Sequence, residues 1–320
     1  MLAQSDSAVV QSSAREKSQP DISIVIVSYN SANVIGACLA SIHASRDALD
    51  VETIVVDNES SDGSAKLVGE QFPWAQLLVG HGNVGFARGN NLGFRHASGR
   101  YLFMLNPDTE VRPGALSALV AFANMHPKAG MIAPHVVNPD GTLQHSTFRF
   151  PDFRQAFYGF FEKMTPLDSP QNGRYLPEDY GRVRKVEHIL GAAVFIRREV
   201  YEQTGGMDEE FGLFFEETDW CFRVRQLGWE VLYTPDATIM HVSAHTTSKN
   251  PERSSVLFAR SRAYFYRKNY GWPGYLGLKV ITIIGLAYWM LRTLFAWLRR
   301  GISNATFRRR LGSYWQILWT

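Results

Sequence analysis

One stretch of the chain, residues 101–108, limits the possible folds most, because an unbroken apolar run stops there at a corner that carries a carboxylate. The run YLFML at 101–105 is typical of a strand buried on both faces of a parallel sheet. Asn106-Pro107-Asp108 follows, and proline pushes the residue before it towards an extended conformation, so Asp108 lies on a stiff corner. Open α/β sheets bind ligands at the carboxyl ends of their strands. Asp108 is therefore a candidate metal or phosphate-site residue, with a solvated turn carboxylate as the alternative.

Two earlier segments have the order strand, polar loop, helix. Residues 21–30 and 51–56 are β-branched apolar runs, and the polar loop after each leads into a helix, with apolar residues at helical spacing over 34–44. This order predicts an α/β fold, a Rossmann-like and mainly parallel sheet with flanking helices. We expect further strands at 77–79, 131–137 and 186–196, and further helices over 85–97 and 113–125.

Composition narrows the class of protein. With 45% hydrophobic residues among 320, the chain can form one large domain or two smaller ones. Two cysteines, Cys38 and Cys221, are too few for a disulfide framework and suit a reducing compartment. The net charge of +3 gives no support for nucleic-acid binding. Residues 1–20 are polar and lack a signal-peptide core, so they are expected to be a disordered tail, and residues 144–184 a long irregular insertion that forms a lid or binding surface.

The C-terminal residues 271–320 combine apolar residues with tryptophans and arginines. Lys279 and Arg292 interrupt the apolar stretch 276–298, whereas a spanning helix needs about 20 apolar residues. The pattern favours amphipathic helices that lie in the membrane interface; a tilted or re-entrant span and an ordinary core helix are the alternatives. The clustered arginines fit the anionic cytoplasmic face of the membrane.

Two more groups of residues have the types that chemistry needs. Residues 82–93 are rich in Gly and Asn but match neither a dinucleotide fingerprint nor a P-loop, so they either let the backbone and Arg88 approach a nucleotide or only punctuate a helix. Residues 214–220 place three acids within four positions after two phenylalanines. Like charges and an apolar flank raise carboxyl pKa values, which suits a general base, although such acids are also common at solvated helix starts. His241 ends an apolar run and is a metal ligand if it faces Asp108, and otherwise a core residue.

These segments together resemble the family 2 glycosyltransferases, which have the GT-A fold. The resemblance covers about residues 21–242 and depends on six motifs in the family's order, SIVIVSYN, VDNESSDGS, GNVGFARGNNLGF, LFMLNPDTEV, GGMDEEFGLFFEETDW and MHV. It implies a glycosyltransferase domain at 21–270, with a nucleotide-sugar half at about 21–130 and an acceptor half at about 131–270, followed by a membrane-associating segment at 271–320.

The resemblance also implies roles for single residues. Asp108 and His241 would hold a Mg²⁺ or Mn²⁺ ion that bridges the diphosphate of the sugar donor. The family's usual Asp-x-Asp appears here as Asn106-Pro107-Asp108, a form common in a rhamnosyltransferase-like branch. The residues expected to contact the nucleotide sugar are Tyr29, Asn30, Asp57, Asn83, Gly85, Phe86, Arg88, Asn90, Asn91 and Asn106.

The family's Glu-Asp-x-Asp reads Glu216-Glu217-Thr218-Asp219 in this chain, which makes Glu217 the expected catalytic base. The expected acceptor-binding residues are Asp208, Glu216, Asp219 and Trp220. The implied reaction is an inverting transfer of a hexose, best matched by L-rhamnose from dTDP-rhamnose, to a saccharide acceptor such as a polyprenyl-diphosphate-linked one, in cell-surface polysaccharide synthesis. A non-catalytic nucleotide-sugar or glycan-binding subunit of the same fold, and a nucleotidyltransferase, are the alternatives.

Overall fold

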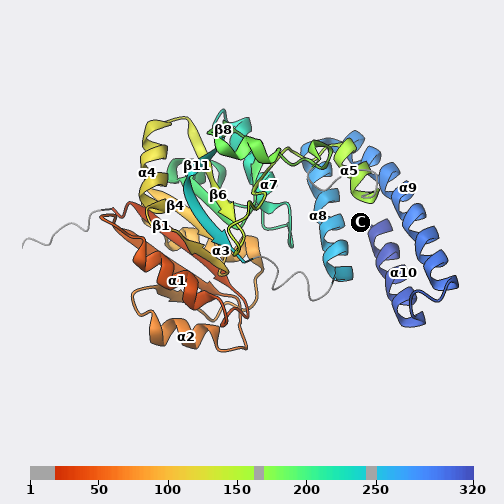
Figure 1. Cartoon of the computed structure of the whole chain (residues 1–320), viewed down its shortest axis with the longest axis horizontal. Coiled ribbons are helices and arrows are strands. Elements are labelled where there is room, and N and C mark those ends of the chain that lie inside the picture. Colours follow the sequence, from red (N-terminus) through yellow and green to blue (C-terminus); the bar gives the residue numbers. More distant parts are fainter. Residues whose placement is uncertain (1–18, 162–168, 243–250) are drawn as a thin grey trace, which may run out of the picture.

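The computed structural model describes residues 19–161, 169–242 and 251–320, so nearly all of the expected N-terminal tail lies outside the described residues. Figure 1 shows an α/β part built around one sheet, and a separate group of helices, α5, α8, α9 and α10, at the other end of the molecule. The α/β part contains both groups of site residues expected from the sequence, those that follow β4 and those at the start of α7.

The central sheet has nine strands in the order β3-β2-β1-β4-β10-β6-β11-β5, with β8 paired to β11. The parallel strands on one side are β1 Ile22–Ser28, β2 Val51–Asp57, β3 Gln76–Leu78 and β4 Tyr101–Leu105. Towards the other edge lie β10 Ala193–Arg197, antiparallel to its neighbours, β6 Ala129–Val137, β11 Glu230–His241, β5 Thr109–Val111 and β8 Arg184–Lys185. The sheet is therefore mixed but mostly parallel through the half that the sequence pattern describes best.

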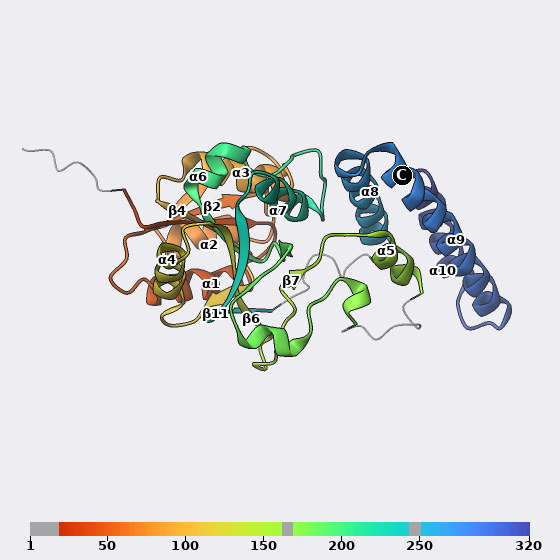
Figure 2. The ribbon, with the colours of Figure 1, turned by 90° about the horizontal axis from the view of Figure 1, so that it is seen from above.

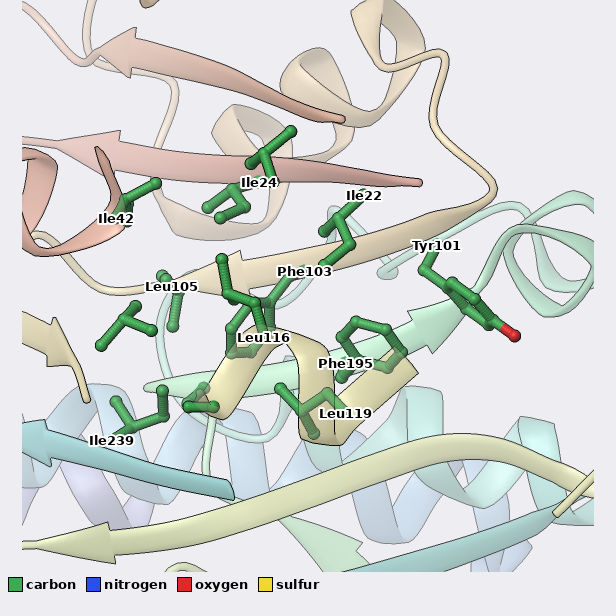
Figure 3. Close-up of a cluster of buried hydrophobic side chains, with 14 of the residues drawn as sticks. Ile22, Ile24, Ile42, Tyr101, Phe103, Leu105, Leu116, Leu119, Phe195 and Ile239 are labelled. Carbon is green, nitrogen blue, oxygen red and sulfur yellow. The ribbon is translucent and has the colours of Figure 1, made fainter. Parts of the chain in front are cut away.

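Side chains of β1 and β4 alternate between two hydrophobic clusters, one on each face of the sheet. Ile22, Ile24 and Ile26 of β1 face the cluster formed with α1 Ile35–Ala44 and α4 Ala115–Met125, together with Tyr101, Phe103 and Leu105 of β4 (Figure 3). Leu102 and Met104 face the opposite cluster with α3 Phe86–His96 and α7 Glu216–Gln226. The expectation that residues 101–105 are buried on both faces is confirmed.

The glycines of α3 allow this helix to lie directly on the sheet. A Cβ atom at Gly93 would come within 2.3 Å of Val25 Cγ1, and one at Gly89 within 3.0 Å of Val27 Cγ1. Such distances leave no room for a side chain. These two glycines therefore pack α3 against β1, and Gly85, with φ of +83°, precedes the helix.

The segment 186–196, expected to be one strand, is divided into two. Residues His188–Ile189 form β9, which pairs with β7 Thr147–Phe148 in a separate small sheet, and the chain then turns through 190–192 into β10. An apolar run shows burial but not pairing partners, so the break could not be read from hydrophobicity. Two helices complete the α/β part, α2 Ser64–Gln71 and α6 Arg198–Thr204.

The helical group joins the insertion at 144–184 to the C-terminal residues. Its members are α5 Phe153–Phe160, α8 Pro251–Asn269, α9 Gly271–Leu298 and α10 Asn304–Leu318, seen side by side in Figures 1 and 2. Phe153 and Phe160 of α5 pack over Gly277 and Gly285 of α9, where a Cβ atom would clash with the rings. The insertion also contains short 3₁₀ helices at Pro170–Asn172 and Pro177–Gly181. The helical group thus includes α8, which the sequence analysis placed before its C-terminal segment.

Among the described residues, α9 is the helix long and apolar enough to cross a membrane by length and composition, with a mean hydropathy of 1.6 in its best window, 22% of which is buried. Lys279, which interrupts the apolar sequence, donates a hydrogen bond to the Leu318 carbonyl of α10 and lies over the Tyr275 ring. Its charge is therefore held inside the helical group. The outward side of α9 exposes mainly apolar residues, Trp272, Leu276, Val280, Ile283, Ile284, Met290, Leu291, Leu294, Phe295 and Leu298.

Candidate active site

The carboxyl edge of the sheet brings Asp108 and His241 together. Asp108 follows β4 and precedes β5, and β11 ends at His241, which pairs with Thr109 of β5. The Asp108 Oδ1 and His241 Nε2 atoms are 3.2 Å apart, and the backbone N–H of Val242 donates to the Asp108 carbonyl. Residues 133 positions apart in sequence thus meet at this edge, as the metal-site hypothesis required.

A second hydrogen bond fixes the orientation of the His241 ring. Its Nδ1 lies 2.7 Å from Gln144 Oε1, an acceptor, while Gln144 Nε2 donates to Asn138 Oδ1. The His241 Nδ1 therefore carries the proton, and in the neutral ring Nε2 presents its lone pair to Asp108. Two acceptors that face each other at 3.2 Å call for a positive charge between them, either a proton on the ring or a cation.

This pair fits a divalent ion that takes its other ligands from the substrate. No group of three or more His, Cys, Asp or Glu side chains able to hold a metal occurs in the described part of the chain. One carboxylate and one imidazole oriented from behind are the protein donors that are present, and Mg²⁺ commonly binds through one or two carboxylates together with substrate phosphates and waters. Asn106 lies beside Asp108, and its backbone is held by the Ala192 carbonyl and by Thr109 Oγ1.

Asp57, at the end of β2, is buried with one unused oxygen. Its Oδ2 accepts from the backbone N–H of Ser60, whereas Oδ1 is buried with no hydrogen-bond partner. An unsatisfied buried acceptor costs about 1–3 kcal/mol, which a ligand donor would recover. Asn30 is bound to the loop that follows β2: its Oδ1 accepts from Ser61 N–H, and its backbone N–H donates to Ser60 Oγ. Tyr29, next to it, is exposed.

The polar side chains of α3 mostly interact with other residues of the protein. The side-chain amide of Asn91 donates to the backbone carbonyl of Met207 and accepts from the backbone N–H of the same residue. It also donates to Glu209 Oε1, and Arg88 forms an ion pair with Glu209 at 3.3 Å. The side chain of Asn90 is buried, with Nδ2 bound to the Phe86 carbonyl and Oδ1 left without a partner. Asn83 Oδ1 accepts from Gly85 N–H. This helix therefore holds the loop 205–211 in place, whatever part it has in nucleotide binding.

Glu217 begins α7 next to an unusual stretch of backbone. Phe214 and Phe215 both adopt left-handed φ values, 69° and 70°, which bulky residues rarely do. Their rings pack against Phe258, and that of Phe215 also against Phe265 of α8. Such strain is kept only where surrounding packing enforces it, and it concentrates at functional sites. The packing fixes the position of the carboxylates that follow.

Burial raises the pKa of Glu217 to about 7, against the opposing effect of backbone N–H groups that include Gly191. The pKa of its neighbour Glu216 is also raised, by burial and by the charge of Glu217, and Glu216 Oε2 has no hydrogen-bond partner. A carboxylate with this pKa is half ionised near neutral pH, as general-base catalysis requires. The Glu217 side chain lies beside Gly191, where an added Cβ would come within 3.6 Å of both Glu217 Cδ and the Phe86 ring.

The turn 190–192 connects the two parts of the site. The backbone N–H of Gly191 lowers the pKa of Glu217, and the Ala192 carbonyl accepts from the Asn106 N–H. Glu217 opens into a cavity of about 660 Å³ that continues towards the helical group. The candidate base and the candidate metal corner are thus anchored to adjacent residues.

Three of the expected acceptor-binding residues lie elsewhere. Asp219 is fully buried and binds Lys268, Arg223 and Asn269, while Asp208 binds Lys268 and Tyr264. The Trp220 ring is fully buried, with Nε1 donating to Thr204. None of the four expected residues, Glu216 included, belongs to the lining of the cavity beside Glu217. Arg223 and Lys268 neutralise Asp219, so this group fastens α7 to α8.

Other residues at the site were not found from the sequence. Gln144 lies in the segment interpreted as an irregular insertion, and Gly191 in a segment interpreted as a strand. His188 lines the cavity in neutral form, because burial lowers its pKa to about 4. Its place beside Thr218, 3.4 Å from the hydroxyl, arises from tertiary packing and leaves no local signal.

Comparison with known proteins agrees with this geometry. A family model described as glycosyl transferase family 2 matches residues 23–204. The chain is 26% identical over 266 residues to N-acetylglucosaminyl-diphospho-decaprenol L-rhamnosyltransferase of Mycobacterium tuberculosis, which covers 78% of this chain and 85% of that protein. It is also 26% identical over 222 residues to the low-salt glycan biosynthesis hexosyltransferase Agl10 of Haloferax volcanii, covering 64% and 62%.

Two solved structures share the fold. A mannosyltransferase of Pyrobaculum calidifontis, solved with GDP-Man and Mn²⁺, superposes with a TM-score of 0.51 at 16% identity over 94% of this chain and 86% of that one. GalNAc-T7, solved with UDP, GalNAc and Mn²⁺, gives a TM-score of 0.53 at 15% identity over 78% and 50%. The expected GT-A architecture, a mostly parallel sheet with flanking helices, is confirmed.

Proposed function

This chain belongs to glycosyl transferase family 2, and on that premise we propose which transfer it performs. The enzyme moves L-rhamnose from dTDP-L-rhamnose, with inversion at the anomeric carbon, to a saccharide linked through a diphosphate to a polyprenol, as a step in cell-surface polysaccharide synthesis. The name of the Mycobacterium tuberculosis relative supports the transferred sugar, L-rhamnose, and the class of acceptor. The Asn106-Pro107-Asp108 form of the metal motif agrees with the same branch.

One observation carries the proposal: Glu217, whose pKa is about 7, lies across a single turn from the Asp108–His241 pair. A single displacement needs a base on one side of the transferred sugar and, on the other side, residues that hold the leaving group of that sugar. No covalent enzyme intermediate is required, because no second nucleophile takes part.

In this mechanism Glu217 accepts the proton of the acceptor hydroxyl as that oxygen attacks the anomeric carbon. The N–H of Gly191 favours the ionised carboxylate, and Phe86 and the left-handed Phe215 lie in the same part of the site. Asp57, through its free Oδ1, accepts a hydrogen bond from the nucleotide. A divalent ion held by Asp108 and His241 would offset the charge of the departing nucleoside diphosphate.

We also propose that the helical group holds the active site at a membrane. We assign the outward apolar side of α9 to the lipid interface on the cytoplasmic face, where arginines such as Arg299 and Arg300 meet anionic lipid. The test is a liposome flotation assay of the triple variant Ile283→Gln, Ile284→Gln, Leu291→Gln. Loss of flotation is expected, whereas the matched variant Val79→Gln, Met125→Gln, Leu227→Gln, which changes exposed apolar residues of the α/β part, should float like the wild type. Equal flotation of both variants would contradict the assignment.

The reaction is tested with the purified full chain in detergent. Rhamnose transfer from dTDP-L-rhamnose to a polyprenyl-diphosphate-linked N-acetylglucosamine is measured against UDP- and GDP-sugars, with Mg²⁺, Mn²⁺ or chelator, and the product anomer is read by NMR. We expect transfer with dTDP-L-rhamnose, inversion, and loss of activity in chelator. His241→Ala should raise the concentration of Mn²⁺ needed for half-maximal rate. A retained anomeric configuration or transfer that chelator leaves intact would each contradict the corresponding part of the mechanism.

A further inference from the structure

The cavity beside Glu217 extends well beyond the sheet and reaches the C-terminal helices. It is lined on one side by Glu217, Thr218 and His188 of the α/β part and on the other by Trp289 of α9 and Ile317 of α10. Its volume of about 660 Å³ is large enough for more than a sugar ring. The cavity therefore connects the base with the helices assigned to the membrane interface.

The cavity wall has two kinds of side chain. Aromatic rings occupy much of it, among them Phe160, Phe214, Phe258 and Trp289. The charged residues of the lining are Arg149, Arg174, Arg262 and Glu217 itself, so its cations outnumber its acids. Apolar walls combined with positive charge suit a ligand that has a lipid part and an anionic part.

Arg262 of α8 is the most unusual of these cations. Its guanidinium carbon lies 5.3 Å from the centre of the Phe160 ring and 5.6 Å from that of Phe258. Its Nε atom is buried without a hydrogen-bond partner, and in the described part of the chain no carboxylate lies within ion-pair distance of Arg262. Burial lowers the pKa of Arg262, while the nearby Tyr266 phenol opposes this effect. The Tyr266 hydroxyl is also buried with no partner.

An arrangement of this kind is costly to keep. A largely buried charge without an acidic partner destabilises a fold, and two cation–π contacts offset only part of that cost. Arginine stays charged at all ordinary pH values and binds phosphate groups with a planar fork of donors. Lys268 of the same helix, in contrast, has two carboxylate partners, Asp208 and Asp219. Arg262 thus has the properties of a residue that awaits an anionic ligand.

We propose that Arg262 binds the diphosphate of the lipid-linked acceptor, with the aromatic wall of the cavity holding the first part of its lipid chain. This site rests on the proposed function, in which the sugar of the same acceptor reaches Glu217. The diphosphate of the donor belongs to a different place, the Asp108–His241 corner at the sheet edge. The helical group then has a role in recognition as well as in membrane contact.

Binding is measured first, because it does not depend on catalysis. Full-length protein in detergent micelles is titrated with farnesyl diphosphate, farnesol, inorganic pyrophosphate and dTDP, and affinity is read by thermal shift and calorimetry. For Arg262→Gln we expect at least a tenfold loss of affinity for farnesyl diphosphate and no change for dTDP. Arg260→Gln, on the exposed side of the same helix, should match the wild type. Equal affinity of Arg262→Gln and wild type for farnesyl diphosphate overturns the proposal, as does a parallel loss for dTDP.

Two further readouts separate binding from structure. Arg262→Met removes the charge and keeps the length, and because the free protein loses an unpaired buried cation, its Tm should not fall. In the transfer assay the KM for the diphosphate-linked acceptor should rise about tenfold or more, with no change for the same saccharide on a neutral alkyl chain. A lower Tm with equal losses for both acceptors would show a structural role and overturn the proposal. If the wild type binds farnesyl diphosphate through Arg262 but transfers no rhamnose, the proposed function fails while the site stands.

Discussion

The buried carboxylates on the two sides of α7 differ in whether a cation is paired with them. On the side towards α8, Asp219 is fully buried and neutralised by Arg223 and Lys268. On the side towards the cavity, Glu217 is close to Phe86 and Gly191, and within the described residues no cation forms an ion pair with it. The paired acid joins two helices, and the unpaired acid keeps a raised pKa. Burial of an acid alone therefore does not indicate catalysis; burial without a paired cation, at the wall of a cavity, is what singles out Glu217.

The largest effect should come from the cavity side. Glu217→Gln keeps the size of the side chain and its contact with Gly191 but removes the base, so the transfer rate should fall by about 10²–10⁴-fold. Initial rates measure the loss, and calorimetry with dTDP should show unchanged donor binding. A variant that keeps near-normal turnover would place the base elsewhere.

The paired side should respond through stability. Asp219→Ala leaves Lys268 and Arg223 without their shared partner and should cost about 3–5 kcal/mol of the free energy of unfolding, measured by denaturant titration. Lys268→Met is the companion variant, which leaves Asp219 still bound to Arg223 and should cost less. If Asp219→Ala folds as stably as wild type yet loses acceptor binding, the division between the two sides is wrong.

Next in size is the dependence on pH. The pKa of Glu217 is about 7 in the folded protein and near 4.5 in an unfolded chain, so the folded state holds its proton more tightly. Stability from this group is present below pH 4.5 and is lost as pH rises through 7, by about 1–3 kcal/mol. Glu217→Gln should therefore be more stable than wild type above pH 7 and nearly equal below pH 4.5. The same ionisation should give log(kcat/KM) an acid limb near pH 7, and a limb near pH 4.5 would contradict the raised pKa.

The smallest effect concerns α3, which supports the paired side through the loop 205–211. Asn91→Ala removes the amide that binds both backbone groups of Met207, so the free energy of unfolding should fall by about 1–3 kcal/mol. Affinity for dTDP should stay within about twofold of wild type. Loss of dTDP binding without loss of stability would instead return Asn91 to the nucleotide site expected from the sequence.

The sequence patterns that depend on local spacing predicted the fold well. The βαβ order and the buried run at 101–105 gave the strands and helices of the nucleotide half, because burial on both faces leaves a continuous apolar signature. The acidic motif located the start of α7 but could not show which of its carboxylates faces Lys268. That distinction depends on α8, about 50 residues later in the chain.

For the same reason, contacts between distant segments could not be predicted from the sequence. Nothing in the local sequence connects Gln144 with His241, which form a hydrogen bond, or Arg262 with Glu217, which line one cavity, because both arrangements exist only after the sheet and the helical group are assembled. Lys279 illustrates a related limit. In the sequence it interrupts an apolar helix, but in the structure its ammonium group donates a hydrogen bond to the end of α10. The outward side of α9 therefore keeps its apolar character.

The turn at 190–192 has a mechanical consequence. The backbone N–H of Gly191 stabilises the ionised form of Glu217, and its neighbour Ala192 accepts a hydrogen bond from Asn106; adjacent Cα atoms are separated by a fixed distance of about 3.8 Å. One peptide unit therefore links the segment beside the candidate base to the candidate metal corner. A change that displaces one of the two is expected to displace the other, so the two parts of the site are mechanically coupled.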